Sequence, residues 1–270
     1  MQVDIPQGRR AVVMTMGALH AGHAALIDMA RQMVDQDGEI VVSIFVNPTQ
    51  FGPGEDYERY PRTWNDDLKM CAEHGVDAVF APTADDLYSA GTDISVDPGP
   101  LGTVLEGAVR PGHFRGVLTV VAKLMNIMRP TDAIFGEKDF QQLALIRRMV
   151  ATLNMPVLVV GAPTVREPDG LAMSSRNAYL SAEQRLTAAI IPRATSAAVT
   201  AAGAGADAAA VRAAAQVLLD AEPGVVVDYV VVTDPDLGPA PDYGPARLLV
   251  AAKIGPPRLL DNVPLVLGAQ

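Results

Sequence analysis

The sequence predicts an α/β protein: a doubly wound parallel sheet followed by a smaller α+β domain at the carboxyl end. In the first part of the chain, short apolar runs alternate with amphipathic helical patterns, as in βαβ units with right-handed crossovers. The run at 39–46 is apolar without alternation, which is typical of a strand buried on both faces. Later in the chain, helices come first and strands are grouped after them. We therefore expect two domains, 1–166 and 167–270.

Each predicted element has a local signal. Apolar runs predict strands of the first domain at 11–13, 39–46, 77–81, 132–135 and 156–161. Helical spacing of apolar residues predicts helices after residue 20, after residue 63, at 117–128 and after residue 139. Thr63 and Asp66 have the spacing of a capping box, and the buried stripe expected for that helix is Trp64, Leu68, Cys71 and Ala72.

The second domain has its own pattern. Ser181-x-x-Gln184 predicts the cap of an alanine-rich helix, and a second helix follows the turn at 203–205. Short strands are expected at 225–232, 248–252 and 259–267.

Composition excludes several classes of protein. A chain of 270 residues with 49% hydrophobic content can build a large core. The net charge of -10 argues against a nucleic-acid partner, because phosphate backbones are bound by excess Lys and Arg. The single cysteine, Cys71, excludes an internal disulfide. No apolar stretch approaches the ~20 residues of a membrane span, and the first residues lack the regions of a signal peptide. We expect a cytoplasmic protein with no membrane partner.

The segment 14–23, Met-Thr-Met-Gly-Ala-Leu-His-Ala-Gly-His, lies where the first strand gives way to the first helix. His20 and His23 are three residues apart, so both imidazoles can lie on one face of the first helical turn. A helix N-terminus offers unpaired N–H groups and a partial positive charge, which suit a phosphate. Gly17 and Gly22 let a ligand approach the backbone. Two capping histidines are the alternative, but the glycines favour a functional site.

Three further polar clusters follow predicted strands or lie in loops: Asn47 with Gln50, Lys138 with Asp139 and Gln142, and Ser174 with Ser175 and Arg176. Ligands of open parallel sheets bind at the carboxyl edge of the strands. Each cluster alone has an ordinary alternative: turn formers, a surface lysine, a helix cap, or an interdomain hinge. Taken together, the clusters indicate nucleotide chemistry at the α-phosphate, with cationic groups stabilising a five-coordinate phosphorus.

The sequence offers no firm metal site. No aspartate and glutamate pair stands out at the spacing of metal ligands. Asp66 or Asp67 could assist Mg²⁺, and a charged helix start is the other interpretation.

Four motifs together resemble one family. They are Thr-Met-Gly-Ala-Leu-His-Ala-Gly-His, Phe-Val-Asn-Pro-Thr-Gln-Phe, Gly-Glu-Lys-Asp-Phe-Gln-Gln-Leu and Asp-Gly-Leu-Ala-Met-Ser-Ser-Arg-Asn. Their order and spacing are those of the pantothenate synthetases (pantoate–β-alanine ligases), over nearly the whole chain. The histidine and Met-Ser-Ser-Arg motifs resemble the two signatures of the wider class I nucleotidyltransferase group, which implies a Rossmann-like sheet.

The resemblance implies a reaction and its ligands. The family joins pantoate to β-alanine with ATP and Mg²⁺, by way of a pantoyl-adenylate, and releases AMP and pyrophosphate. This is a step of pantothenate and coenzyme A biosynthesis. The resemblance also implies a homodimer, a nucleotide- and pantoate-binding domain at 1–166, and a lid domain at 167–270.

The resemblance further implies site residues. The catalytic residues would be His23 as the usual acid, His20, Lys138 and Arg176. The ATP-binding residues would be Met16, Gly17, His20, Gly22, His23, Gly136, Lys138, Asp139, Val165, Met173, Ser174, Ser175 and Arg176. The residues for pantoate or β-alanine would be Gln50, Gln142, Asn47, Met16 and Arg110, the last paired with Glu106 near the pantoate pocket.

Met14 departs from the family pattern, which usually has proline there. Proline would fix that backbone, so Met14 would loosen the loop by about 0.5–1 kcal/mol through unfolded-state entropy. We expect lower ATP affinity rather than lost activity. The chain also begins close to its first strand, where family members commonly carry a helical lead-in, so we expect different packing of that strand.

Three other functions stay open at this point. A nucleotidyltransferase of the same fold could transfer AMP or CMP to a phosphate-bearing acceptor, although the paired glutamines favour a carboxylic polyol. An aminoacyl-tRNA synthetase shares both signatures, but an acidic chain lacks an obvious tRNA-binding surface. A catalytically dead nucleotide-binding module would not require His20, His23, Lys138 and Arg176.

Overall fold

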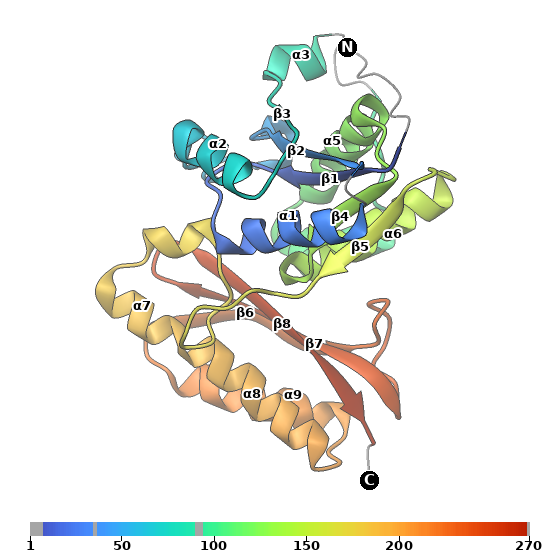
Figure 1. The fold of residues 1–270 in the computed structure, drawn as a ribbon. Helices are drawn as coiled ribbons and strands as arrows, with labels where there is room; N and C mark the ends of the chain where they lie inside the picture. The colour runs from blue at the N-terminus through green and yellow to red at the C-terminus, as the bar shows by residue number, and fades with distance from the viewer. Residues whose placement is uncertain (1–7, 35–36, 90–93, 269–270) are drawn as a thin grey trace. The chain divides into compact units, whose positions relative to one another are not determined.

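The computed structural model describes residues 8–34, 37–89 and 94–268, and the chain divides into two compact units (Figure 1). The first consists of Met1–Glu137 with Gln141–Pro163, and the second of Lys138–Phe140 with Thr164–Gln270. The boundary near residue 163 precedes the expected one at 166, and no local signal predicts that Lys138–Phe140 belongs with the second unit. The amino-terminal residues considered for a signal peptide lie outside the described ranges.

A parallel sheet forms the centre of the first unit. Its strands, in the order β3-β2-β1-β4-β5, all run parallel. Their bounds are β1 Arg10–Thr15, β2 Glu39–Ile44, β3 Ala78–Phe80, β4 Asp132–Gly136 and β5 Leu158–Ala162. The order reverses between β1 and β4, so their carboxyl ends flank the crevice where doubly wound sheets bind ligands. The predicted fold class is confirmed.

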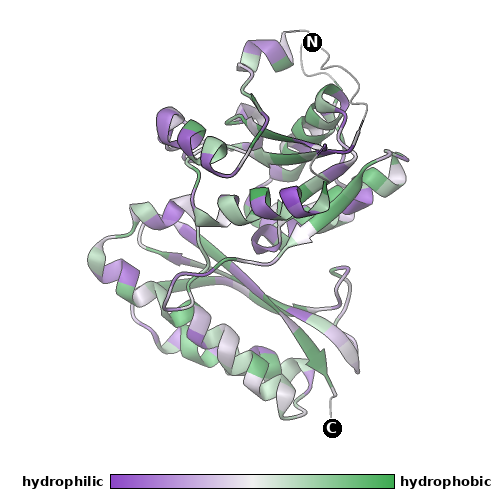
Figure 2. Cartoon of the chain, in the orientation of Figure 1, coloured by the Kyte–Doolittle hydropathy of each residue, from purple (hydrophilic) through white to green (hydrophobic). Residues whose placement is uncertain are grey.

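Apolar strands explain this sheet. Val12 lies between Val41 of β2 and Ala133 of β4, and all three side chains are buried. Figure 2 shows apolar colour through these central strands. The helix α1 (Ala21–Met33) covers β1 and β4 with Ile27 and Ala30, which are fully buried. Continuous apolar runs therefore become strands that are covered on both faces.

The other helices of this part of the chain are α2 Trp64–Glu73, α3 Ala84–Tyr88, α4 Glu106–Val109, α5 His113–Met128 and α6 Phe140–Thr152, with 3₁₀ turns η1 Pro48–Gln50, η2 Pro100–Thr103 and η3 Glu137–Asp139. Helix α5 starts before the expected residue 117, because Phe114 is the only large apolar residue of its first turn and cannot by itself show a helical period. In the described residues no helix has the length and apolar character needed to cross a membrane.

Two expectations for α2 are wrong. Thr63 is the N-cap residue but makes no capping hydrogen bond, since its hydroxyl donates to Asp67 instead of capping with Asp66. Trp64 is 48% exposed, whereas Asp67 and Cys71 are buried. Ala72 is exposed as well. The buried face is thus set by a carboxylate that serves the neighbouring loop, which apolar periodicity cannot reveal.

The second unit packs helices on an antiparallel sheet. Its helices are α7 Ala182–Ala188, α8 Ile190–Gly203 and α9 Ala208–Ala221, and a 3₁₀ turn, η4, spans Ser175–Tyr179. The strands β6 Val225–Thr233, β7 Gly244–Ile254 and β8 Arg258–Leu267 pair in sequence order. The predicted capping box of Ser181 and Gln184 is present in α7. The expected single helix breaks before α8, where Pro192 cannot continue the hydrogen bonds of α7.

The core and edges of this sheet are distinct. Leu219 of α9 and Leu248 of β7 are fully buried in one apolar cluster. On the outer strand β6 the register shifts between Val227 and Tyr229, a β-bulge. On the other outer strand, β8, Pro264 lies opposite Arg247 of β7.

Candidate functional site

The β1–α1 junction places two histidines together. His20 is the N-cap of α1, and its Nδ1 accepts a hydrogen bond from Gly22 N at 3.1 Å. His23 Nδ1 accepts one from His20 N at 3.2 Å, and the two ring centres are 4.2 Å apart. Because both Nδ1 atoms accept, each neutral ring carries its proton on Nε2, where it can donate to a phosphate oxygen. Capping and ligand binding are therefore compatible here.

A buried carboxylate holds the loop in front of the histidines. Asp67, 2% exposed, accepts hydrogen bonds from Ala18 N (3.1 Å), Leu19 N (2.8 Å) and the Thr63 hydroxyl (2.9 Å). Gly17 and Ala18 both have positive φ, 83° and 50°. The left-handed conformation of Ala18 costs about 1 kcal/mol, which the Asp67 bonds offset. Asp67 thus fixes this loop rather than serving as an obvious metal ligand.

Asn47, Gln50 and Met16 form a second group in the first unit. Asn47 Nδ2 donates to Gln50 Oε1 (3.1 Å) and to Gly116 O (3.2 Å). Asn47 Oδ1 accepts from the Tyr88 hydroxyl at 2.7 Å. Gln50 Nε2 points at Met16 Sδ, 3.3 Å away. Thioether sulfur is a weak acceptor, so a substrate carboxylate or hydroxyl would be a stronger partner for this amide.

Arg110 and His113 hold the backbone of Gln50. Arg110 makes a bidentate ion pair with Glu55 (2.9 and 2.5 Å) and donates to His113 Nε2 (3.0 Å) and Gln50 O (3.3 Å). His113 Nδ1 lies 2.9 Å from Gln50 O. One tautomer fits both contacts, with the proton on Nδ1 and Nε2 accepting. Arg110 therefore acts on Gln50 and Glu55 in this structure.

Two pKa values reflect this arrangement. Burial, together with the charge of Arg110, lowers the pKa of His113 to about 4, so the ring is neutral at pH 7. Burial alone would raise the pKa of Glu55, but its hydrogen bonds and ion pair with Arg110 outweigh burial and hold that pKa below its usual range.

The adjacent glutamines of α6 differ in role. Gln141 is 3% exposed; its Nε2 donates to Leu101 O (2.8 Å) and Val104 O (2.9 Å), and its Oε1 accepts from Glu106 N (3.0 Å). It fixes the turn that carries Glu106. Gln142 is only half-buried and stays the candidate for a ligand.

Gly136 ends β4, beside the switch point, and the chain then enters the second unit for Lys138–Phe140. Lys138 is half-buried, with Nζ 3.6 Å from Asp139 Oδ1. Its backbone carbonyl accepts a hydrogen bond from Asn262 Nδ2 at 2.9 Å.

The loop 173–176 is fixed at both ends within the second unit. Met173 N donates to Val165 O at 3.0 Å, and Ser174 Oγ caps η4 by accepting from Arg176 N at 3.3 Å. The next residue, Asn177, donates to Glu167 Oε1 at 2.6 Å. Arg176 and Ser175 are half-buried in the first turn of η4.

The predicted residues thus fall into two groups. The first unit holds Met16, Gly17, His20, Gly22, His23, Asn47, Gln50, Arg110, Gly136 and Gln142. The second holds Lys138, Asp139, Val165, Met173, Ser174, Ser175 and Arg176.

Sequence reasoning assigned no role to Glu55, His113, Gln141, Arg247 and Asn262. His113 had a signal: it is one of four histidines and lies three residues after Arg110. The contacts of Arg247 and Asn262 depend on the register between β7 and β8, for which the sequence has no local signal.

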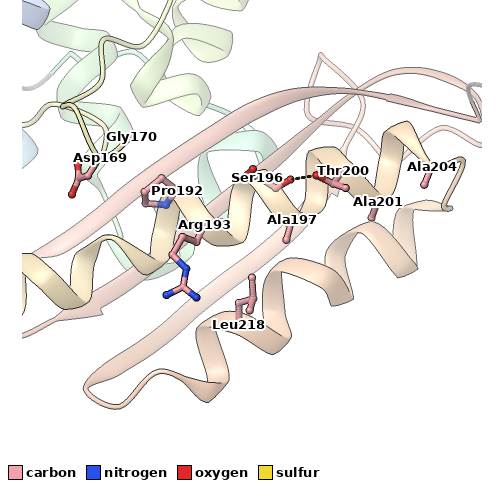
Figure 3. A pocket seen from close by; sticks show the side chains of 10 residues that line it. All are labelled: Asp169, Gly170, Pro192, Arg193, Ser196, Ala197, Thr200, Ala201, Ala204 and Leu218. Atoms are coloured by element: carbon pink, nitrogen blue, oxygen red, sulfur yellow. Dashed lines mark hydrogen bonds between the residues drawn. The ribbon is translucent and has the colours of Figure 1, made fainter.

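A hollow on the second unit offers little chemistry. It has a volume of about 780 Å³ and lies along α8, with Leu218 of α9 on its wall. Figure 3 shows the hydrogen bond that the Thr200 hydroxyl donates to the backbone carbonyl of Ser196. The guanidinium of Arg193 also lines the hollow. None of the predicted site residues lines it.

A protein-built metal centre is not evident in the described ranges. No cluster of three or more His, Cys, Asp or Glu side chains there could hold an ion. Both oxygens of Asp67 already accept hydrogen bonds, and Asp66 is exposed.

Comparison with known proteins decides the family. A family model described as pantoate-beta-alanine ligase matches residues 3–264. The chain belongs to this family. Among curated pantothenate synthetases, that of Nocardioides sp. is 57% identical over 267 residues, covering 96% of this chain and 79% of the relative. That of Thermobifida fusca is 55% identical over 275 residues, covering 96% and 90%.

Solved structures of this ligase family share the fold. Pantothenate synthetase from Thermus thermophilus matches with a TM-score of 0.92 and 48% identity, over 96% of this chain and 94% of that one. The pantoate-beta-alanine ligase of Francisella tularensis, complexed with beta-gamma ATP and beta-alanine, matches with a TM-score of 0.78 and 34% identity, over 96% and 90%. The predicted family and enzyme class are confirmed.

Proposed function

We propose that this ligase condenses pantoate with β-alanine in two steps at the expense of ATP. The pantoate carboxylate attacks the α-phosphorus of ATP, forms pantoyl-adenylate and expels pyrophosphate. The β-alanine amine then attacks the activated carbonyl and expels AMP. Neither step needs a nucleophile from the protein, since the mixed anhydride itself activates the carbonyl.

The observation that carries the proposal is the β1–α1 junction. Two imidazoles whose Nδ1 atoms are occupied by backbone N–H groups present Nε2–H donors at a helix N-terminus. Such preorganised donors stabilise negative charge that grows on phosphate oxygens in the transition state. His23 and His20 would contact the ATP phosphates, with Met16, Gly17, Gly22 and Gly136 lining the nucleotide site.

The pantoate site would lie with Gln50. The amides of Gln50, Asn47 and Gln142 supply hydrogen bonds for a carboxylate and two hydroxyls, while Met16 offers an apolar surface for the gem-dimethyl group. Arg110 would serve this site by holding the carbonyl of Gln50.

The second unit would act as the lid domain and supply the cations. Lys138 and Arg176 would neutralise the phosphates, Asp139 would bind the ribose, and Val165 with Met173, Ser174 and Ser175 would close over the nucleotide. Mg²⁺ would arrive with ATP, held mainly by phosphates and water, as is usual for this ion. We further propose a cytoplasmic homodimer.

Pyrophosphate exchange tests the proposal. The enzyme is incubated with ATP, Mg²⁺, labelled pyrophosphate and pantoate, without β-alanine, beside a control with other hydroxy acids. We expect label in ATP with pantoate alone, and AMP once β-alanine is added. Exchange with another hydroxy acid and not with pantoate would contradict pantoate as the substrate, and AMP formation by an enzyme that shows no exchange would contradict the two-step reaction.

A further inference from the structure

The short segment Lys138–Phe140 is fastened to the antiparallel sheet of the second unit. Asn262 of β8 donates from Nδ2 to the carbonyl of Lys138 at 2.9 Å. The Arg247 guanidinium of β7 lies 3.7 Å from the centre of the Phe140 ring, a close cation–π contact. The segment is therefore held at its first and last residues.

The two anchoring side chains also hold each other. Arg247 Nη1 donates to Asn262 Oδ1 at 2.5 Å, which fixes the orientation of the Asn262 amide with its NH₂ group toward Lys138. Asn262 is 4% exposed, and its own N–H donates to Asp261 Oδ1. Asp261 in turn forms a bidentate ion pair with Arg166. A buried, hydrogen-bonded chain of this kind has little freedom to rearrange.

We propose that Asn262 and Arg247 are positioning residues that set the place of the Lys138 ammonium on the ATP phosphates. The inference rests on the proposed function of Lys138. A lysine side chain is long and flexible, so its reach depends on where its backbone is held. The contacts at the Lys138 carbonyl and at the Phe140 ring orient the 3₁₀ turn η3, which carries the Lys138 side chain.

A double-mutant cycle on ATP affinity tests this. ATP binding to the full-length enzyme is measured by calorimetry with Mg²⁺ and no pantoate, for wild type, Asn262→Ala, Lys138→Ala and the double variant. We expect Asn262→Ala to weaken ATP binding about tenfold, the effect of about one lost hydrogen bond. In the Lys138→Ala background, which keeps the backbone carbonyl, the same change should have less than about a twofold effect.

Controls separate positioning from general damage. Asn126→Ala removes a matched contact, an amide that donates to a backbone carbonyl at 2.9 Å on the exposed side of α5, and should leave ATP binding unchanged. Pantoate affinity should be the same in Asn262→Ala as in wild type. Arg247→Met, which leaves Asn262 in place, gives an independent second variant should Asn262→Ala fail to fold.

The outcomes are distinct. An equal loss of ATP affinity from Asn262→Ala in both backgrounds, or no loss in wild type, would overturn the positioning role while leaving the proposed function intact. Coupling with Lys138 in an enzyme that shows no pantoate-dependent exchange would support the positioning role and refute the proposed function. Wild-type protein that binds no ATP would overturn both.

Discussion

Gly17 occupies a backbone conformation that other residues rarely adopt. Its φ is 83°, and a Cβ placed there would lie 3.0 Å from Asp67 Oδ2 and 3.2 Å from Ile44 Cγ2. The position therefore needs glycine both for its conformation and for its tight surroundings. Gly224, in an exposed turn of the second unit, has the same φ of 83° with nothing within 4 Å.

These two glycines make a matched pair of substitutions. Gly17→Ala and Gly224→Ala should each lower the free energy of unfolding by about 1 kcal/mol through the conformational cost alone. Gly17→Ala should also push against Asp67 and weaken ATP binding, whereas Gly224→Ala should leave it unchanged. Chemical denaturation and calorimetry measure both effects, and equal ATP affinity in the two variants would contradict the role of the loop.

Asp67 and Asp66 allow a similar comparison of neighbouring carboxylates. In Asp67→Asn, one oxygen is replaced by an NH₂ group, which would face a backbone N–H that now donates to the carboxylate. We expect a loss of about 2 kcal/mol in stability and lower ATP affinity. Asp66→Asn should change stability by no more than about 0.5 kcal/mol. If Asp66→Asn instead altered the Mg²⁺ dependence of pyrophosphate exchange, the exposed carboxylate would be the one that assists the metal.

At the scale of elements, the 3₁₀ turn η1 rests directly on α5. A Cβ at Gly116 would lie 2.3 Å from Thr49 O and 2.7 Å from Gln50 Cα, so the helix can approach η1 only because residue 116 has no side chain. Asn47 bonds to the carbonyl of the same Gly116. The contact fixes the distance of the Gln50 backbone from α5.

Gly116→Ala should reverse the usual effect of alanine in a helix. At a helix position with free space, replacing glycine with alanine stabilises the protein by roughly 1 kcal/mol. Gly203, in the last turn of α8, has nothing within 4 Å of an added Cβ, so Gly203→Ala should give a small gain in stability. Gly116→Ala should instead destabilise the protein and raise the KM for pantoate, because η1 must move. Thermal unfolding and steady-state kinetics check this, and a stable Gly116→Ala enzyme with unchanged KM would refute it.

The contact between α5 and the 3₁₀ turn also predicts a pH dependence. His113, in the first turn of α5, has a folded-state pKa of about 4 against an ordinary value of 6.5. The unfolded chain therefore binds the proton first as pH falls, so the stability contribution is complete above pH 6.5 and is lost progressively toward pH 4. His113→Gln, which keeps a donor for Gln50 O, should flatten this slope in unfolding followed at pH 7, 5.5 and 4.5. Parallel slopes for both proteins would count against a buried neutral histidine.

At the scale of the whole molecule, each unit has an apolar cluster of its own among the residues that the structure describes. Ile27 belongs to the core of the first unit and Leu219 to that of the second, and both are fully buried. The single tryptophan, Trp64, is in the first unit, so its fluorescence reports on that unit. Circular dichroism reports on the helices of both units.

A mutation in the apolar cluster of one unit should shift the unfolding transition of that unit and not that of the other. Leu219→Ala and Ile27→Ala should each cost about 2–5 kcal/mol, the usual range for a buried aliphatic side chain. Leu219→Ala should shift the circular dichroism transition while leaving the Trp64 transition in place, and Ile27→Ala should shift the Trp64 transition. A single transition moved equally by either change would mean that the units unfold as one.

Much of this architecture could be predicted from the sequence because its signals are local. Continuous apolar runs located every strand of the parallel sheet, and glycines marked the β1–α1 junction. Partners that depend on register or on distant loops could not be predicted: Asp67 with the amides of Ala18 and Leu19, or Asn262 with Lys138. The helix α2 was misjudged for the same reason, since its buried face is decided by what Asp67 contacts.

The two outer strands of the antiparallel sheet, β6 and β8, also affect the tendency of the protein to aggregate at high concentration. An open strand edge can recruit a strand from another molecule and start aggregation. The bulge at Val227 and Tyr229 breaks the regular row of backbone groups on β6. On β8, Pro264 lacks an N–H, and the carbonyl of Asn262 already accepts from Arg166 at 3.4 Å. Both edges are thus poor templates for strand addition, which favours solubility at high concentration.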